Sequence, residues 1–154
     1  YLHKEIGYNY RMSNVLAAIG LSQIDVLEER TKKKREIQQF YASFLNDIDG
    51  FQMFDECSSE YKSNHWLSIV EMDKEKLQIS ALDLMRLLAK KNIESRRIWK
   101  PLHTQPVFAE FDFYGSIVAE TIFENGLCLP SGTAMTSADL NFIKTEILAA
   151  IKHD

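Results

Sequence analysis

Residues 64–72 (NHWLSIVEM), 80–91 (SALDLMRLLAKK) and 93–98 (IESRRI) follow one another along the chain and decide its fold class. The first segment is rich in aromatic and β-branched residues, as a half-buried strand would be. Ser80 and Asp83 form a capping-box pattern ahead of an apolar run, which predicts a well-buried helix over residues 80–91. The third segment is predicted to be a second, short strand. Strand, helix and strand in this order indicate a small α/β layer.

The helical pattern ahead of this unit begins near Ser13, whose hydroxyl can accept a hydrogen bond from an amide of the first turn. Apolar residues fall on one stripe over residues 12–29 and on a second stripe over residues 37–48, which Gly50 ends. Other apolar residues of the first helix lie off its stripe, and they predict a second buried contact with a subunit or domain. The basic run at residues 32–35 is flanked by glutamates, which favours a solvated, salt-bridged helix face over a phosphate-binding patch.

The chain after residue 98 continues with a loop marked by two prolines. It then predicts a short helix over residues 116–124, a short strand over residues 127–129 and a terminal helix opened by Thr136 and Asp139. Helices and strands therefore alternate along the whole chain. This order predicts one three- or four-stranded sheet with helices packed on one side.

Composition limits the classes of function. The chain has 154 residues, 45% of them hydrophobic, which suffices for one domain with a buried core. A net charge of -4 argues against a nucleic-acid partner, because phosphate binding needs a basic surface. No apolar run approaches the roughly 20 residues of a membrane span, so no membrane partner is expected. Cys57 and Cys128 stand far apart and outside any CxxC pattern, which favours a reducing cytoplasm over a disulfide framework or a zinc site.

The opening residues 1–11 (YLHKEIGYNYR) begin with tyrosine and show neither a signal-peptide pattern nor a hydrophobic period. We expect this segment to be an interior loop of a longer chain. Residues 7–14 (GYNYRMSN) run into the predicted helix N-terminus, where backbone amides with Asn9 and Arg11 as donors suit a phosphate or another anion. A capped loop that packs its tyrosines explains the same residues equally well.

Three further segments gather polar or turn-forming residues. Residues 96–106 (RRIWKPLHTQP) combine two arginines, a lysine, a histidine and an indole, which favours a bound carboxylate or phosphate and a stacked ring over a structural role. His65 beside Trp66 is more typical of a packed, hydrogen-bonded residue than of a catalyst. Residues 123–132 (FENGLCLPSG) are explained by a helix-to-strand turn and a loop. The sequence contains no GxGxxG, P-loop, HExxH or GxSxG signature.

Four segments, GYNYRMSNVLAAIGLSQID, NHWLSIV, RRIWKPLHTQP and FENGLCLPSG, occur in this order. Together they resemble the C-terminal portion of the DegT/DnrJ/EryC1/StrS family of sugar aminotransferases, which depend on pyridoxal 5'-phosphate (PLP). The resemblance covers nearly the whole chain. It implies the C-terminal small domain of a fold type I PLP-dependent transferase, an α/β domain whose small mixed or antiparallel sheet is packed with helices. It also divides the chain into an active-site loop with a linking helix (residues 1–36) and a C-terminal small α/β domain (residues 37–154).

The resemblance implies a cytoplasmic homodimer whose active site is shared between subunits. Members of the family move an amino group from glutamate onto a keto group of a nucleotide-linked sugar, in the biosynthesis of cell-surface polysaccharides and glycans. The RxxWKPLHxQP form of the third segment is similar to members that act on UDP-linked N-acetylated 4-keto sugars. The implied partners are thus a nucleotide sugar, glutamate and a second subunit.

Individual residues follow from the same resemblance. Asn9 occupies the position that reaches across the dimer toward the cofactor phosphate, and Arg11 in the same loop would serve that phosphate or the nucleotide diphosphate. His65 matches a histidine near the nucleotide-sugar cleft. No catalytic residue and no metal ligand is assigned. Four residues match the loop that lines the nucleotide-sugar entrance: Arg97, Trp99, Lys100 and His103.

The resemblance assigns the cofactor lysine, the aspartate that pairs with the pyridinium nitrogen and the aromatic stacking residue to a large domain upstream of Gly7. None of the lysines present here stands at the family's position for the cofactor lysine. This chain by itself is therefore expected to be inactive. Two other readings stay open: a stand-alone anion-binding or dimerisation module that uses residues 96–103, and a purely structural domain. A dehydratase of the same family is also an open alternative.

Overall fold

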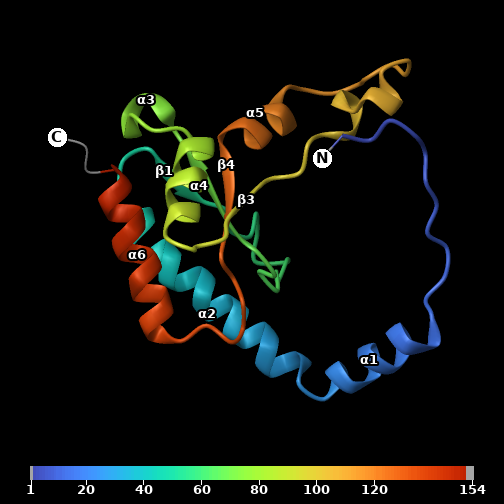
Figure 1. Cartoon of the computed structure of the whole chain (residues 1–154), viewed down its shortest axis with the longest axis horizontal. Helices are drawn as coiled ribbons and strands as arrows, with labels where there is room; N and C mark the ends of the chain where they lie inside the picture. Colours follow the sequence, from blue (N-terminus) through green and yellow to red (C-terminus); the bar gives the residue numbers. More distant parts are fainter. Residues whose placement is uncertain (1, 152–154) are drawn as a thin grey trace.

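The computed structural model of the protein describes residues 2–151 and contains a four-stranded antiparallel sheet (Figure 1). Its strands, in the spatial order β1-β2-β4-β3, are β1 (Phe51–Met53), β2 (Ser68–Met72), β4 (Gly126–Leu129) and β3 (Arg96–Arg97). Every pair of neighbours is antiparallel, so the antiparallel form of the predicted sheet is the one adopted. Val70 pairs with Met53 on one side and with Leu127 on the other, which makes β2 and β4 the central strands.

In the part of the chain that the structure describes, six α-helices and two short 3-10 helices surround or extend from this sheet. The predicted order of helices and strands is confirmed, with β1 and the shortest helices as additions. The helices are α1 (Asn14–Ile24), α2 (Leu27–Leu45), α3 (Lys74–Leu77), α4 (Ala81–Lys90), η1 (Leu102–Thr104), η2 (Pro106–Phe108), α5 (Val118–Asn125) and α6 (Ser137–Ile151). No helix within residues 2–151 combines the length and the apolar character that crossing a membrane requires.

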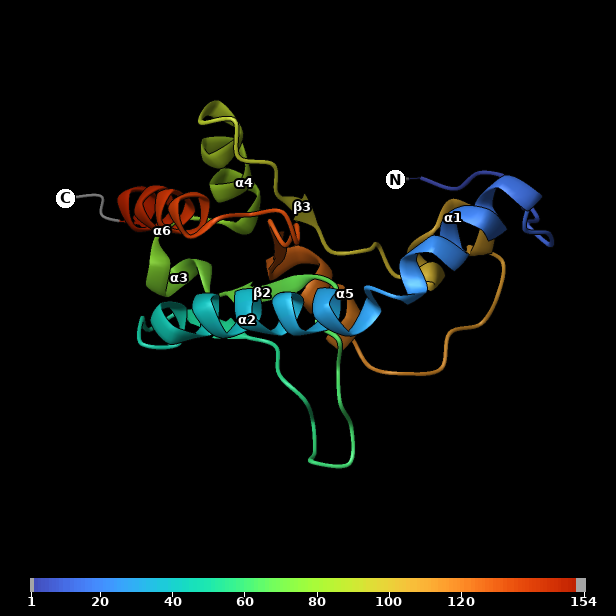
Figure 2. The same cartoon turned by 90° about the horizontal axis from the view of Figure 1, so that it is seen from below.

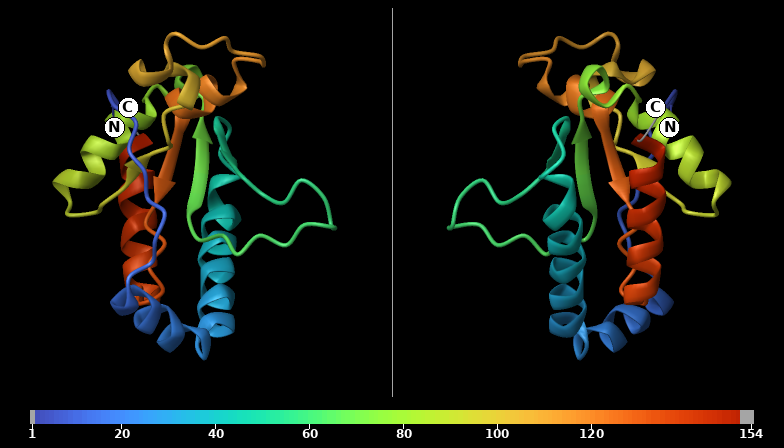
Figure 3. Two further views of the ribbon diagram at one scale, coloured as in Figure 1. Left: turned by 90° about the vertical axis from the view of Figure 1, so that its right-hand side faces the viewer. Right: turned by 90° about the vertical axis from the view of Figure 1, so that its left-hand side faces the viewer.

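The core lies between one face of the sheet and helices α2, α4 and α6 (Figure 3). Burial alternates along β2, because successive side chains of a strand point to opposite faces. Val70 and Leu127 of the sheet, Leu84 of α4 and Ile147 of α6 are completely buried. Each such side chain contributes about 1.5–3 kcal/mol relative to an exposed one. The predicted packing of these helices on one side of the sheet is therefore confirmed.

Tyr41 of α2 anchors this core to the segment that follows β4. Its ring is fully buried, and its hydroxyl donates a hydrogen bond of 2.9 Å to the carbonyl of Pro130. Burial raises the pKa of Tyr41, since the phenolate would be poorly solvated there. The hydroxyl is thus a permanent donor that fixes α2 against the chain leaving the sheet.

The helix starts follow the capping rules. Ser13 accepts a hydrogen bond from the amide of Leu16 at 3.3 Å, and Ser80 accepts one from the amide of Asp83 at 3.1 Å. At α6 the Thr136 amide donates to the Asp139 carboxylate at 2.8 Å. All three predicted helix starts are confirmed, because each depends only on residues within one turn.

Two predicted strands are shorter in the structure. The segment 64–72 forms a strand only from Ser68, because side chains before it hold local turns: Asn64 accepts from the Trp66 amide at 3.1 Å and Ser63 from the His65 amide at 3.0 Å. His65 also has a positive φ of 45°, which no strand residue adopts. The segment 93–98 pairs with β4 only through Arg96 and Arg97.

The basic run at the start of α2 does more than form a solvated face. Arg35 donates to the Glu56 carboxylate at 2.7 Å and to the Ser63 carbonyl, and Lys34 donates to the Trp66 carbonyl at 2.8 Å. These bonds tie α2 to the long loop over residues 54–67, which projects from the body in Figures 2 and 3. Lys33 pairs with Glu36 at 3.9 Å and Arg35 with Glu56, as a salt-bridged face would. The bonds from Lys34 and Arg35 to backbone carbonyls were not predicted, since a sequence does not show which distant carbonyls a cation will meet.

The N-terminal segment, residues 2–13, runs along the outside of the molecule as an arc that α1 continues (Figure 1). Helix α1 contains no buried residue, so its predicted apolar stripe and its predicted second contact both lack a partner within residues 2–151. The helix ends at Ile24 rather than near residue 29, and α2 begins at Leu27. The predicted division after residue 36 falls inside α2, and it stays a prediction.

Candidate ligand-binding site

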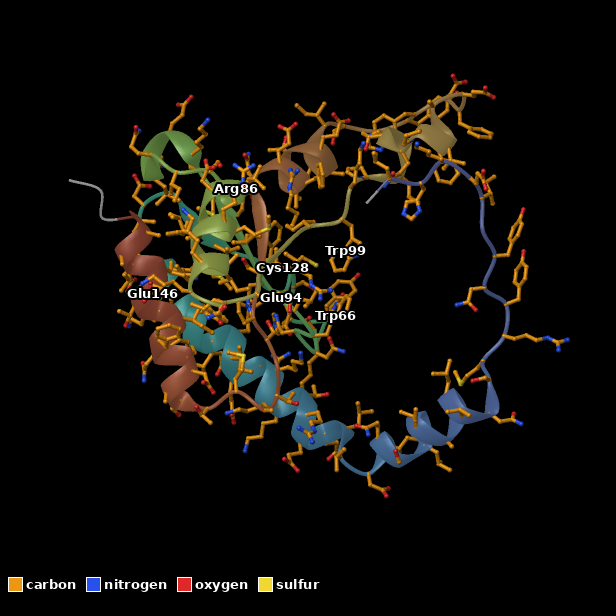
Figure 4. The ribbon with its side chains drawn as sticks, in the orientation of Figure 1. Trp66, Arg86, Glu94, Trp99, Cys128 and Glu146 are labelled. Carbon is orange, nitrogen blue, oxygen red and sulfur yellow. The ribbon has the colours of Figure 1, made fainter. Side chains whose placement is uncertain are left out.

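A pocket of about 900 Å³ with a largely apolar lining opens beside β3 and β4. Its walls come from the loop before β2, from the segment after β3, from α5 and from the N-terminal segment. Figure 4 shows Trp66, Trp99 and Cys128 together on this side of the sheet. The residues that line the pocket are His3, Trp66, Leu67, Arg96, Arg97, Ile98, Trp99, Lys100, Pro101, Leu102, Gln105, Ala119, Ile122 and Cys128.

Two indoles line this pocket. The rings of Trp66 and Trp99 stack with centroids 5.6 Å apart and planes inclined by 27°. Both remain largely exposed, at 59% and 56% of their surface. A stacked aromatic pair that keeps this much surface in water is suited to receive a planar ring or the apolar face of a sugar. Trp99 was predicted from the sequence, whereas Trp66 was noted only as the neighbour of His65.

The arginines of the same segment already have partners. Arg97 donates to the Phe123 carbonyl at 3.0 Å, and its guanidinium carbon lies 4.0 Å above the centre of the Phe123 ring. Arg96 donates twice to the Glu94 carboxylate, at 2.9 and 2.6 Å. The two guanidinium groups therefore do not form one open anion-binding fork in this conformation. Lys100, which also lines the pocket, has no hydrogen bond or ion pair with the residues described.

His103 lies outside the pocket wall. Its Nε2 is 2.8 Å from a carboxylate oxygen of Glu120, and its ring stacks on Phe113 with centroids 3.7 Å apart. These contacts join η1 to α5 and to the loop between them. The structure thus brings Arg97, Trp99 and Lys100 together. His103 instead holds the loop between η1 and α5 through its contacts with Phe113 and Glu120.

His65 lies in a different place from the other predicted residues. Its side chain is buried and its Nε2 is 3.8 Å from Glu56, in a small pocket of about 190 Å³ against α2. Hydrogen bonds from the Arg35 guanidinium and from the Ser63 amide lower the pKa of Glu56. The carboxylate is therefore charged at neutral pH and holds the loop over residues 54–67 in position. In this conformation His65 faces this carboxylate and not the Trp99 pocket.

Cys128 of β4 lines the pocket, and Gly126 stands two residues before it on the same strand. Cys128 is 5% exposed, and burial raises the pKa of its thiol although Arg96 acts in the opposite direction. The neutral thiol is an apolar surface rather than a nucleophile. At Gly126 a Cβ atom would lie 2.0 Å from the Ile98 side chain, so the glycine lets Ile98 cover the end of β4. The sequence signal for these residues was the segment 123–132, which was explained by structural need alone.

Asn9 and Arg11 stand on the exposed N-terminal segment, before the N-terminus of α1. Neither side chain has a hydrogen bond or ion pair within residues 2–151, and residues 7–14 contain no carboxylate. An amide and a guanidinium donor beside a helix N-terminus form a donor set that fits a phosphate group. The residues present therefore fit the phosphate of the cofactor that the sequence implied. Nowhere in the described part of the chain do three or more His, Cys, Asp or Glu side chains gather as metal ligands.

Known proteins place this architecture in one family. Residues 1–148 match the DegT/DnrJ/EryC1/StrS aminotransferase family. The chain is 41% identical to the putative pyridoxal phosphate-dependent aminotransferase EpsN of Bacillus subtilis strain 168, over 99% of this chain and 39% of that protein. It is 32% identical to GDP-perosamine synthase of Escherichia coli O157:H7, over 93% of this chain and 37% of that protein.

A solved structure agrees with these relatives. The aminotransferase TlmJ from Streptoalloteichus hindustanus superimposes with a TM-score of 0.74 at 26% identity, over 89% of this chain and 36% of TlmJ. The chain thus spans about two fifths of the length of the curated relatives it matches. Because the family match extends over nearly every residue and the fold agrees with a solved aminotransferase, this chain belongs to the DegT/DnrJ/EryC1/StrS aminotransferase family.

Proposed function

We propose that this chain is the C-terminal part of a PLP-dependent aminotransferase that moves an amino group from glutamate onto a keto group of a nucleotide-linked sugar. One observation carries the proposal: a pocket with stacked indoles adjoins the segment on which Asn9 and Arg11 have no partner among residues 2–151. The relatives support the class of reaction, since one is named as a PLP-dependent aminotransferase and another as the synthase of a GDP-linked amino sugar. The whole protein is proposed to be a cytoplasmic enzyme of cell-surface glycan biosynthesis.

The role of the N-terminal segment in this proposal is to hold the cofactor phosphate. Asn9 would donate its side-chain amide, and Arg11 would add a positive charge, to that phosphate or to the nucleotide diphosphate. Once bound, PLP supplies the electron sink that lets an amino group leave one carbon and join another. The chain described here would orient that group and would not itself provide the lysine that holds it.

The role of the pocket is to bind the nucleotide sugar. Trp66 and Trp99 would stack on a planar or apolar face of the ligand, and Lys100 would attract its diphosphate. Arg97 would act at the same entrance, next to α5. His103 and His65 are proposed as more distant parts of the same cleft in the assembled enzyme. The narrower proposal is a UDP-linked N-acetylated 4-keto sugar.

The proposed enzyme is a homodimer in which Asn9 of one subunit serves the cofactor of the other. A lysine in a preceding large domain would hold the cofactor. The exposed apolar residues of α1 support this arrangement, because an exposed apolar patch of this kind marks a contact surface. The chain alone is therefore proposed to lack activity.

The test uses the full-length protein encoded by the gene that contains this chain. Purified protein is incubated with PLP, 15N-labelled glutamate and either a UDP-linked N-acetylated 4-keto sugar or a GDP-linked 4-keto sugar. We expect 2-oxoglutarate and a 15N-labelled amino sugar, with the UDP-linked substrate preferred. Loss of a hydroxyl group without nitrogen transfer would identify a dehydratase instead. A protein that neither binds PLP nor forms 2-oxoglutarate would leave the anion-binding module as the better description.

A further inference from the structure

His3 of the N-terminal segment is bound to the loop that carries η1 and η2. Its amide donates to the side-chain Oε1 of Gln105 at 3.1 Å, and its carbonyl accepts from the amide of Val107 at 3.1 Å. These two hydrogen bonds are the only ones that join residues 2–12 to the body of the chain, within the part that the structure describes. We refer to this pair of bonds, between His3 and residues 105–107, as the clasp.

The clasp is built on a fixed acceptor. Gln105 is only 3% exposed, although the loop around it lies at the surface. The backbone amide of Gln105 donates to the Leu102 carbonyl at 2.9 Å, and its backbone carbonyl accepts from the Phe108 amide at 2.9 Å. These two bonds hold its backbone, and burial leaves its side chain little room to change rotamer. A buried amide oxygen in a fixed position is a costly group to leave unpaired, so the bond to His3 is strongly preferred over none.

The clasp also lies in the wall of the candidate pocket. His3 and Gln105 both line the same hollow as Trp66 and Trp99. On the other side, residues 4–13 lead from His3 to the Ser13 cap of α1 and carry Asn9 and Arg11. The segment is thus held at two ends, by the clasp and by α1, and nothing described between those ends fixes it. Figure 1 shows this course, in which the segment leaves the loop near η1 and η2 and returns toward α2 through α1.

We infer that Gln105 is a positioning residue that holds the segment carrying Asn9 and Arg11 against the loop carrying Trp99. The inference rests on the proposed function for the identity of the two ligands, the cofactor phosphate and the nucleotide sugar. With the clasp closed, both ends of the segment are fixed, at His3 and at α1. The side chains of Asn9 and Arg11 are then confined to a small region. With the clasp open, no described contact between His3 and α1 holds the segment against that loop, so the segment must be ordered when the phosphate binds.

Binding of the phosphate is therefore expected to weaken when the clasp is removed. Gln105→Met keeps the length and volume of the side chain and removes the acceptor, whereas Gln105→Glu keeps an oxygen acceptor at the same place. His3→Pro removes the donor from the other side. The matched control is Gln52→Met, because Gln52 is exposed on the edge strand β1, far from the pocket. None of the four changes touches Asn9, Arg11 or Trp99.

The first measurement needs no cofactor. In the full-length protein without PLP, the rate of trypsin cleavage after Arg11 reports how often the segment leaves its position. We expect Gln105→Met and His3→Pro to raise this rate about 3- to 10-fold, the effect of losing one hydrogen bond, with no change for Gln52→Met. Gln105→Glu should restore the rate of the unmodified protein. The double variant His3→Pro/Gln105→Met should be no faster than either single variant, since both remove the same bond.

The second measurement is the dissociation constant of PLP, from equilibrium dialysis followed by absorbance. We expect Gln105→Met to raise it about 3- to 10-fold, and to raise the KM for the nucleotide sugar, while kcat at saturating PLP and sugar stays within about 2-fold because the bond is not made to the reacting atoms. Equal cleavage rates and equal PLP affinity in Gln105→Met and the unmodified protein would overturn the inference, as would additive effects in the double variant. If the unmodified protein does not bind PLP but its cleavage rates follow the expected pattern, the clasp stands and the proposed function fails.

Discussion

The indole of Trp66, which precedes β2, stacks on the indole of Trp99, which follows β3, with 5.6 Å between ring centroids. The two residues flank strands that are not neighbours, because β4 lies between β2 and β3. Because β2 and β3 are both antiparallel to β4, they run in the same direction, and the contact joins the segment that enters β2 to the segment that leaves β3. The ammonium group of Lys34, on α2, donates a hydrogen bond of 2.8 Å to the backbone carbonyl of Trp66. This bond fixes the backbone that carries one ring of the pair.

Replacing either indole should weaken binding of the nucleotide sugar. Stacked aromatic contacts are worth about 0.5–1.5 kcal/mol beyond the area they bury, so Trp66→Ala and Trp99→Ala should each raise the KM about 2- to 10-fold in the full-length enzyme. Initial-rate kinetics at saturating glutamate and PLP measure this. Tyr61→Ala is the control, since Tyr61 is exposed but lies outside the pocket. A normal KM in both tryptophan variants would remove the pair from the substrate site.

Asn9→Ala in the full-length enzyme should weaken retention of PLP by about 1–3 kcal/mol, the cost of leaving a buried acceptor without a donor. Mixed dimers test the proposed crossing between subunits. One subunit carries Asn9→Ala, and the other lacks the cofactor lysine. The single site that has a lysine then meets the unmodified Asn9 of the other subunit and should hold PLP normally. If that site loses PLP as readily as the Asn9→Ala homodimer, Asn9 acts within its own subunit.

The ion pair between Glu56 and Arg35 predicts a pH-dependent stability. The folded protein holds the pKa of Glu56 below its usual value, chiefly through hydrogen bonds from Arg35 and the Ser63 amide. The charged carboxylate therefore favours folding above the unfolded-state pKa of about 4.3, and this contribution is lost as the pH falls through the lower folded-state pKa. Thermal unfolding should give a lower Tm for Glu56→Gln than for the unmodified chain at pH 7.

The same difference in Tm should shrink as the pH falls from about 4 through the lower folded-state pKa, because Glu56 is then protonated in both folded and unfolded states. Arg35 and His65 both face Glu56 and stay unchanged in this comparison. Glu60→Gln is the matched control in the same loop, since the Glu60 side chain has no partner among the residues described. A difference that persists undiminished at low pH would show that the charge of Glu56 does not stabilise the fold.

Gly126→Ala should destabilise the chain by about 2–3 kcal/mol, the upper part of the usual range for overpacking. The new Cβ would lie 2.0 Å from Cδ1 of Ile98 and 2.5 Å from the carbonyl oxygen of Ile122. Adding Ile98→Ala should recover only part of the loss, because the second contact is with backbone. Urea unfolding followed by circular dichroism measures both variants. Gly20→Ala is the control, since a Cβ there meets nothing within 4 Å, and it should stabilise helix α1.

Ser80→Ala should destabilise the chain by about 1 kcal/mol, because the Asp83 amide in the first turn of α4 loses its acceptor. Ser43→Ala is the matched control. Its hydroxyl donates to the Phe40 carbonyl on the exposed side of α2, where the replacement should be neutral or slightly stabilising. Equal unfolding midpoints for the two variants in urea would mean that the cap contributes nothing measurable.

The sequence by itself determined the features that depend on neighbouring residues. Ser13, Ser80 and Thr136 each define a helix start through contacts within one turn, and the aromatic and β-branched residues of segment 64–72 predicted the strand β2. The four segments that resemble the sugar aminotransferases also followed from sequence alone, and the match over residues 1–148 confirmed the family. Local patterns suffice here because capping and strand alternation are short-range effects.

Only the tertiary structure decided which distant groups meet. It paired Trp66 with Trp99, turned Arg97 onto the Phe123 carbonyl and set His65 against Glu56. It also joined His3 to Gln105 across most of the chain. None of these contacts follows from spacing along the sequence, because each depends on the order β1-β2-β4-β3 and on the side of the sheet that α2, α4 and α6 cover. That arrangement is settled by the burial of many apolar side chains at once, a property of the whole fold and not of any one segment.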